Sequence, residues 1–327
     1  MIRKVVGVVG ALVCSTLLGT QQGSAQVLFS ENFDVDHTAN WLTFVAGTGT
    51  HSADFFFDYS TVGIPAAPNS IGGTTRGLKL QANIDPLNVP PPATVTGVSV
   101  SPVGGDFTGN YRLRFDMWLN FHGPLDVGGN GSTEITSAGI GTAATNLQIA
   151  GRTPDSVYFG ASGDGGSTAD YRAYSPASGA PGYQDADGVF AAGGRNNTLP
   201  YYSGFGGEVA PAQQLALFPG QTGSTAIGAQ GFAWRDVLIE VLDATVTFSI
   251  DSVIIATVDT TTFSGTGGTN ILFNQFDINN SPSNDPNAPT LQFGLIDNIR
   301  VELIPEPTAA LGAALGLAAM LARRRRR

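Results

Sequence analysis

Short runs in which apolar and polar side chains alternate recur along the chain, and Gly, Asn, Asp or Pro bound most of them. A period of two residues is typical of a β-strand with one buried face. No stretch between residues 26 and 302 sustains a helical period over three turns. We therefore expect strands at 27–33, 41–46, 54–60, 76–84, 94–100, 111–121, 156–162, 232–242, 244–250, 252–259, 270–278 and 295–304.

In YRLRFDM, apolar and charged residues alternate strictly. One face of the expected strand carries Tyr111, Leu113, Phe115 and Met117, and the other carries Arg112, Arg114 and Asp116. A second pattern predicts a β-hairpin. Val246, Phe248 and Ile250 share one face, Asp251 and Ser252 form the turn, and an apolar run returns over 253–258. Serine stands where such turns usually have glycine.

About a dozen strands joined by short turns predict an all-β chain folded as a β-sandwich. The segment from about residue 123 to 231 is rich in glycine and turn residues, so we expect it to be a set of long loops or an insertion. The domain would then span residues 26–302, between two terminal segments of different character.

The composition of residues 26–304 narrows the choice of ligands. These residues contain 9 Lys and Arg against 25 Asp and Glu, a net charge of −16, compared with −10 for all 327 residues. Nucleic acid and anionic lipid are poor partners for such a surface, whereas cations and neutral polymers suit it. Cys14 is the only cysteine, and it lies outside this part of the chain. The domain therefore has no disulfide, thiol nucleophile or cysteine metal site.

The first 25 residues read as a secretory signal peptide. Arg3 and Lys4 precede an apolar run that ends at Leu18, and small residues at Gly23 and Ala25 predict cleavage after Ala25 by signal peptidase. A lipoprotein signal at Cys14 is the alternative. Such a signal needs a small residue before the cysteine, and Val13 stands there.

The last residues combine three features in order. Pro305, Glu306 and Pro307 precede an apolar stretch at 308–322, and five arginines follow: Arg323, Arg324, Arg325, Arg326 and Arg327. As a helix, the apolar stretch would cover about 22 Å, short of a ~30 Å hydrocarbon core unless Leu303, Ile304 and snorkelling arginines extend it. Clustered arginines stay on the cytoplasmic side, so the domain would face away from the cytoplasm. A nucleic-acid-binding or nuclear-targeting run is the alternative.

This ordered trio resembles the PEP-CTERM sorting signal, residues 303–327 here, of Gram-negative bacteria. The resemblance implies that an exosortase in the membrane recognises Pro305, Glu306 and Pro307 and cuts near them. It also implies a short transmembrane helix at the C-terminus, which anchors the chain transiently in the inner membrane before release to the envelope or extracellular matrix.

The domain resembles the concanavalin A-like, or laminin G-like, jelly roll. Three stretches carry the resemblance: FSENFD followed by Trp41, FAWRDVLIEVLDATVTFSIDSVIIATVD, and the closing FGLIDNIRVEL. They cover about a third of the domain. Bodies of this kind often accompany PEP-CTERM tails, and such proteins accompany exopolysaccharide and biofilm production.

Catalysis is poorly supported by the sequence. A glycosidase needs two carboxyl groups about 5–9.5 Å apart. The acid-x-acid pairs are Asp34/Asp36 and Asp185/Asp187, both in turn-like sequence, and the Glu-x-Asp-x-x-Glu strand of jelly-roll glucanases is absent. Asp236 and Glu240 share a strand face but are about 13 Å apart. None of His37, His51 and His122 lies in a nucleophile or metal motif.

Two binding hypotheses remain. Structural Ca²⁺ would be held by loop oxygens, with Asp185 and Asp187 as the candidate ligands; ordinary Asx turns are the alternative. Six of the 8 tyrosines lie between 158 and 202, among Asp and Asn residues. Flat rings with a polar tip suit sugars, so we expect a glycan-binding surface that contains Tyr171, Tyr174, Tyr183, Tyr201 and Tyr202. The alternative is tyrosine that covers the sandwich.

The sequence as a whole predicts a secreted, non-enzymatic envelope or matrix protein that is structural or binds polysaccharide. The alternative is a carbohydrate-active enzyme, a glycoside hydrolase or lyase, on the same fold.

Overall fold

The protein is described from a computed structural model, which covers residues 25–85, 87, 94–122, 133–152, 154–165, 169–176, 182–186, 189–191, 194–278 and 287–305. The predicted signal peptide up to residue 24 and the tail from Glu306 lie outside these ranges. Within the described part of the chain, no helix is long and apolar enough to cross a bilayer.

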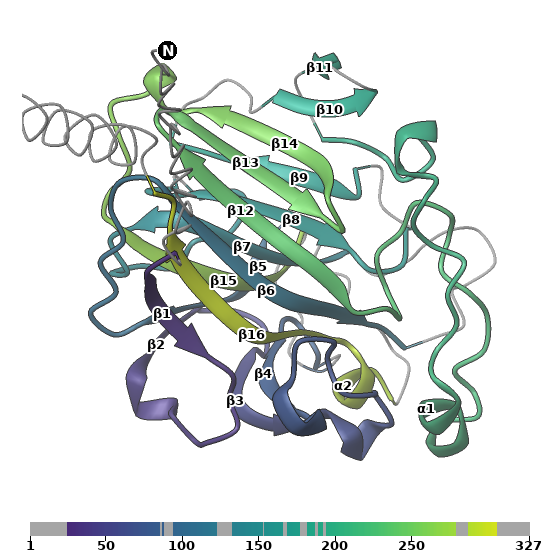
Figure 1. The fold of residues 1–327 in the computed structure, drawn as a ribbon. Helices are drawn as coiled ribbons and strands as arrows, with labels where there is room; N and C mark the ends of the chain where they lie inside the picture. The colour runs from purple at the N-terminus through teal and green to yellow at the C-terminus, as the bar shows by residue number, and fades with distance from the viewer. Residues whose placement is uncertain are drawn as a thin grey trace, which may run out of the picture.

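Two antiparallel sheets form a β-sandwich, with sheet A in front and sheet B behind it in Figure 1. In spatial order, sheet A contains β11 (Val189–Ala191), β10 (Gly182–Ala186), β14 (Val253–Asp259), β13 (Thr245–Ile250), β12 (Arg235–Leu242), β6 (Tyr111–Asn120), β16 (Phe293–Leu303), β4 (Arg76–Gln81) and β3 (Ser52–Asp58); β1 (Val27–Glu31) also pairs with β16. Sheet B contains β2 (Trp41–Val45), β5 (Thr96–Pro102), β15 (Asn270–Asp277), β7 (Glu134–Thr142), β8 (Val157–Ser162) and β9 (Tyr171–Tyr174). The sandwich predicted from the alternating pattern is confirmed.

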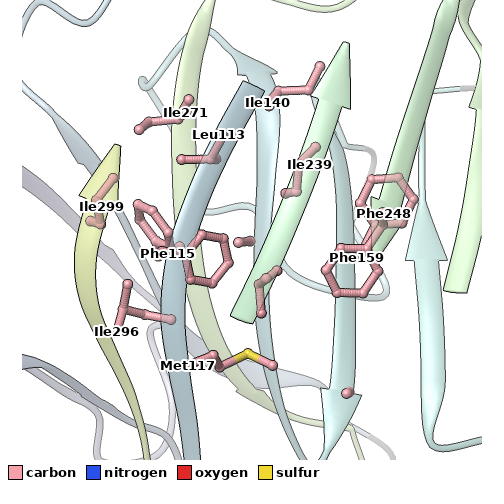
Figure 2. Packing of buried hydrophobic residues seen from close by; sticks show 14 of the residues in the cluster. Leu113, Phe115, Met117, Ile140, Phe159, Ile239, Phe248, Ile271, Ile296 and Ile299 are labelled. Carbon is pink, nitrogen blue, oxygen red and sulfur yellow. The ribbon is translucent and has the colours of Figure 1, made fainter. Parts of the chain in front are cut away.

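The main core lies between the sheets. Leu113, Phe115 and Met117 of β6 point toward side chains of sheet B, as Figure 2 shows. The ring of Phe248 stacks on that of Phe159 with centroids 4.9 Å apart, which joins β13 to β8 across the interior. Apolar burial of this kind contributes roughly 25 cal/mol per Å² of surface removed from water. Because the domain has no disulfide, this core is its main source of stability.

A smaller apolar cluster covers part of the outer face of sheet A. Trp118 and Trp234 lie with ring centroids 5.7 Å apart, and the edge of Tyr59 meets Trp234 at 5.3 Å. The 3₁₀ turn η2 (Tyr59–Val62) and the helix α1 (Ala212–Leu217) pack here. Figure 1 shows α1 and the one-turn helix α2 (Ala288–Leu291) at the lower right.

The β13–β14 hairpin forms as predicted, with Ile250 paired to Val253. Asp251 and Ser252 both have positive φ, 48° and 68°, as a type I′ turn requires. The strand predicted at 156–162 is β8, but the expectation for the rest of residues 123–231 was incomplete, because β7, β9, β10 and β11 also lie in this segment. These strands are short or built from small residues, so their alternation is weak in the sequence.

Candidate functional site

Two of the predicted glycan-binding tyrosines are core residues. Tyr171 and Tyr202 each have 0% of their surface exposed, and their rings stack with centroids 4.1 Å apart. The Tyr171 hydroxyl donates to Gly228 O and accepts from Gln230 Nε2 at 2.6 Å. The prediction is therefore wrong for both residues, because a ligand at the surface cannot reach them in this structure. Tyrosine fits the interior here because each hydroxyl-bearing ring packs beside loops that supply polar partners.

The remaining predicted residues lie apart from one another. Tyr201 is half-buried and its hydroxyl donates to Ile254 O at 2.9 Å, on the side of the sandwich formed by β14. The backbone of β10 includes Tyr183 and Asp185, whose side chains lie outside the described structure, as does Asp187. The structure therefore does not test these three side chains.

Among the predicted tyrosines, Tyr174 lies beside a candidate site on the outer face of sheet B. Tyr174, at the end of the edge strand β9, is half-buried and stacks on Tyr158 of β8 with ring centroids 4.7 Å apart. On the next strand, Gly139 lies opposite Tyr158. A Cβ at Gly139 would lie 2.4 Å from Tyr158 Cβ, so only glycine leaves room for the tyrosine there.

A row of small polar residues crosses sheet B beside this pair. Asn274 of β15 lies between Ser99 of β5 and Ser137 of β7 in the strand register. Residues paired in register share a face, and Asn274 lies on the same face of β15 as Leu272 and Phe276, which pack outside the main core. We call this outer face, defined by Tyr158, Tyr174, Ser137 and Asn274, the tyrosine face.

Several polar groups of the tyrosine face have no hydrogen-bond partner. Both amide atoms of Asn274, the Ser137 hydroxyl and the Tyr158 hydroxyl are buried and unpaired. An unpaired buried polar group costs about 1–3 kcal/mol, so such groups are rare unless a water or ligand meets them. Burial also raises the pKa of Tyr158 well above its ordinary value, which keeps its hydroxyl protonated and able to donate.

The segment between β7 and β8 covers one side of this face. Gln148 N donates to Ser99 Oγ at 3.2 Å, and Ile149 packs with Tyr158 and Leu272. Tyr174, at the edge of the sheet, is half-buried, whereas Tyr158, Ser137 and Asn274 are at most 1% exposed. Asn274 was missed in the sequence, although a polar residue at an apolar-face position of ILFNQF was a readable signal.

Carboxylates are absent from this face in the described strands. Glu134 and Asp277 occur on β7 and β15, but the alternation turns both toward the interior. On sheet A, Asp236 and Glu240 are bound instead by arginines, with Arg114 Nε and Arg112 Nε donating to them at 2.6 Å.

Two buried carboxyl groups lie on neighbouring strands at the outer face of sheet A. Asp116 and Asp297 are opposite one another on β6 and β16. Burial raises the pKa of Asp297 to about 7 and raises that of Asp116. Their oxygens accept from Asn69 Nδ2 at 2.7 Å, from Tyr59 Oη at 3.0 Å and from Asn298 Nδ2 at 2.8 Å.

Both carboxyl groups are at most 1% exposed, because the segment around Asn69 lies over them. A substrate cannot reach them in this arrangement. The pair therefore fixes the 59–75 segment to the sheet.

A metal site is not visible in the part of the chain that the structure describes, where no three His, Cys, Asp or Glu residues converge. The proposed Ca²⁺ ligands Asp185 and Asp187 are not covered by that observation.

No protein-family model matches the chain, and no curated protein matches it. Among solved structures, it is similar to a protein of unknown function with a galectin-like fold from Bacillus subtilis, at 11% identity and a TM-score of 0.40, over 85% of this chain and 97% of that one. It is similar to the laminarinase from Rhodothermus marinus at 10% identity and a TM-score of 0.40, over 86% and 99% of the two chains. A Bacillus licheniformis β-glucanase matches at 10% identity and a TM-score of 0.37, over 87% and 100%. Likenesses this distant carry no conclusion about function.

Proposed function

We propose that this chain is a secreted, non-enzymatic protein with a concanavalin A-like jelly roll that binds polysaccharide through the tyrosine face. The observation that carries the proposal is the half-buried Tyr174 ring at the edge of sheet B. The unpaired groups of Asn274, Ser137 and Tyr158 lie behind it in residues that are at most 1% exposed, so a saccharide meets them only when the segment between β7 and β8 moves aside. A saccharide offers the donors and acceptors that an amide and two hydroxyls lack, and its apolar face suits a tyrosine ring. The described strands of this face carry no carboxylate, which is consistent with binding without hydrolysis.

The test compares binding to a glycan array by the wild-type protein and two variants. Tyr174→Ala removes the half-buried ring at the edge of the sheet, and Asn274→Leu removes the unpaired amide while keeping a similar volume. Each variant should weaken binding at least tenfold, which corresponds to about 1.4 kcal/mol. Tyr201→Ala is the matched control, since this half-buried tyrosine lies elsewhere and should leave binding unchanged.

Thermal unfolding of Asn274→Leu separates a ligand-binding amide from a packing defect. Removing an unpaired buried amide should stabilise the free protein by about 1 kcal/mol or more. Higher stability together with lost glycan binding supports the proposal. Higher stability with unchanged binding would show that the amide destabilises the fold without contacting the ligand. The tyrosine face would then be rejected as the site.

The route to the envelope is part of the same proposal. Signal peptidase would cut after Ala25, and an exosortase would cut near Pro305, Glu306 and Pro307, leaving the arginines Arg323–Arg327 on the cytoplasmic side. Ala25 and the exposed Pro305 both lie at the ends of the folded domain, which leaves them accessible to proteases. The intact mass of the protein from its native envelope tests this route: a mass that includes residues after Pro307 contradicts it.

The enzyme alternative is tested directly. Purified protein should release no reducing sugar from crude exopolysaccharide. Activity that disappears in Asp297→Asn would instead identify the buried acid pair as a catalytic centre and overturn the non-enzymatic assignment.

A further inference from the structure

A separate cleft of about 500 Å³ opens at one end of the sandwich. Its lining includes Tyr111 at the start of β6, Val241 near the end of β12 and Ile140 near the end of β7. The segments 107–109 and 260–269 form its walls. A volume of 300–1,000 Å³ is usual for small-molecule sites, so one sugar ring fits here with room to spare.

The walls of this end cleft are held by backbone contacts. Gly268 N donates to Gly141 O at 2.9 Å, and Phe107 N donates to Thr269 O at 3.0 Å. A Cβ at Gly141 would lie 2.6 Å from Thr266 Cγ2, so glycine permits this close approach. A site whose walls are already in place loses little free energy in ordering when a ligand binds.

The chemistry of the lining selects the class of ligand. Phe107, Tyr111 and Phe263 supply aromatic surface, while Thr108 and Ser264 present exposed hydroxyls at the rim. Tyr111 is 3% exposed, and burial raises its pKa, so its hydroxyl stays neutral.

The charge of the cleft lining narrows the class of ligand further. The lining contains no Lys or Arg, and its single charged side chain is Asp243. One Asp243 oxygen accepts from Asn110 Nδ2 at 3.2 Å, and the other has no partner among the described residues. A carboxylate with a free oxygen accepts well from neighbouring hydroxyl groups and repels anions. A purely apolar ligand would leave the hydroxyls at the rim without partners.

We propose that the end cleft binds one neutral hexopyranose unit, with the apolar face of the ring against Phe263 and its hydroxyls at Asp243, Thr108 and Ser264. This site is independent of the tyrosine face, since none of its lining residues belongs to that face. Two glycan sites on one domain allow a single molecule to hold two polysaccharide segments, and linked sites raise avidity without new contacts.

The test uses saturation-transfer NMR with methyl glucoside, methyl galactoside and methyl mannoside on the full-length protein. At least one neutral hexoside should receive saturation from the protein. Ser264→Trp, which fills the cleft, should abolish the signal, and Phe263→Ala should weaken binding at least tenfold. Ser224→Trp and Phe218→Ala are the matched controls, because one is exposed, the other half-buried, and both lie outside the cleft. Glucuronate should bind at least tenfold more weakly than glucoside because of Asp243.

Failure of all three neutral hexosides, or binding that Ser264→Trp leaves intact, would overturn the end cleft as a sugar site. Equal binding of glucuronate would overturn the role given to Asp243. Tyr174→Ala distinguishes the two sites, since it should leave hexoside binding at the end cleft unchanged while weakening binding to the array. If the hexosides fail to bind while binding to the array persists, only the end cleft is rejected. If the hexosides bind but Tyr174→Ala leaves binding to the array unchanged, only the tyrosine face is rejected.

Discussion

At the scale of single residues, two carboxyl groups dominate the electrostatics of the buried structure. Asp116 and Asp297 face each other under the 59–75 segment, and both accept hydrogen bonds from neutral donors only. The sequence placed Asp116 correctly on the face opposite Phe115. It did not reveal the burial of Asp116, because the covering segment comes from residues 47 positions earlier.

The pH dependence of stability should report on Asp297. Its pKa is about 7 in the folded protein and 3.8 without the fold. Between pH 4 and pH 7 the folded state holds the extra proton, so the free energy of unfolding falls as the pH rises through this range. The loss is on the order of a few kcal/mol. Urea unfolding at several pH values should show this fall in the wild type and a smaller one in Asp297→Asn.

Asp259 provides a control of opposite sign for that experiment. Hydrogen bonds from Thr261 hold the pKa of Asp259 below its usual value. Its contribution is therefore present at neutral pH and is lost as the pH falls through the folded pKa. Asp259→Asn should leave the slope between pH 4 and pH 7 unchanged. A wild-type minus Asp297→Asn difference that is constant over this range contradicts the assignment.

At the scale of secondary structure, alternation located most strands but not those made of small residues. The hairpin of β13 and β14 was predicted because Val246, Phe248 and Ile250 mark one face strongly. In contrast, β7 reads EITSAGIGT and is buried along its whole length. Its glycines accommodate large neighbours such as Tyr158, a requirement set by the adjacent strand and invisible in β7 alone.

The prediction for Tyr171 was wrong for a related reason. Sequence proximity joined Tyr171 and Tyr174 into one expected surface, but alternation along β9 sends Tyr171 into the core and Tyr174 to the outer face. The candidate site instead combines β8, β9, β7 and β15, which meet only through the strand order of sheet B. Strand order of this kind depends on pairings between distant segments, which no local pattern encodes.

The turn of the β13–β14 hairpin should be improvable by one substitution. Ser252 has φ 68° and is exposed, with no side-chain hydrogen bond. Left-handed backbone costs a non-glycine residue roughly 1–2 kcal/mol, and glycine avoids this cost while losing somewhat more entropy on folding. Ser252→Gly should therefore stabilise the domain by about 0.5–1 kcal/mol and raise Tm by about 2 °C.

A β-branched residue at the same position provides the opposite comparison. Ser252→Val should lower Tm, because a branched side chain tolerates positive φ poorly. Calorimetry on the two variants and the wild type measures the order of the three Tm values. A valine variant as stable as the glycine variant would contradict the type I′ geometry.

At the scale of the whole molecule, the two ends of the domain meet at one place. Leu303 N donates to Gln26 O at 2.9 Å, and Ile304 N donates to Asn110 O at 2.9 Å. The last strand, β16, ends at Leu303, immediately before Pro305. Processing after Ala25 and near Pro-Glu-Pro would therefore remove no residue of any strand.

Truncation at the C-terminus should show a sharp boundary for this reason. A chain of residues 26–305 keeps β16 paired with β6, β4 and β1, so its Tm should lie within about 1 °C of that of the full chain.

A chain that ends at Asn298 loses Ile299 and Val301, which are 1% and 0% exposed in the main core. Deleting two such side chains costs several kcal/mol, comparable to the whole stability of a domain, so this chain should not fold. Circular dichroism and thermal unfolding measure both, and a stable 26–298 chain would show that the end of β16 is dispensable and that the domain boundary lies earlier.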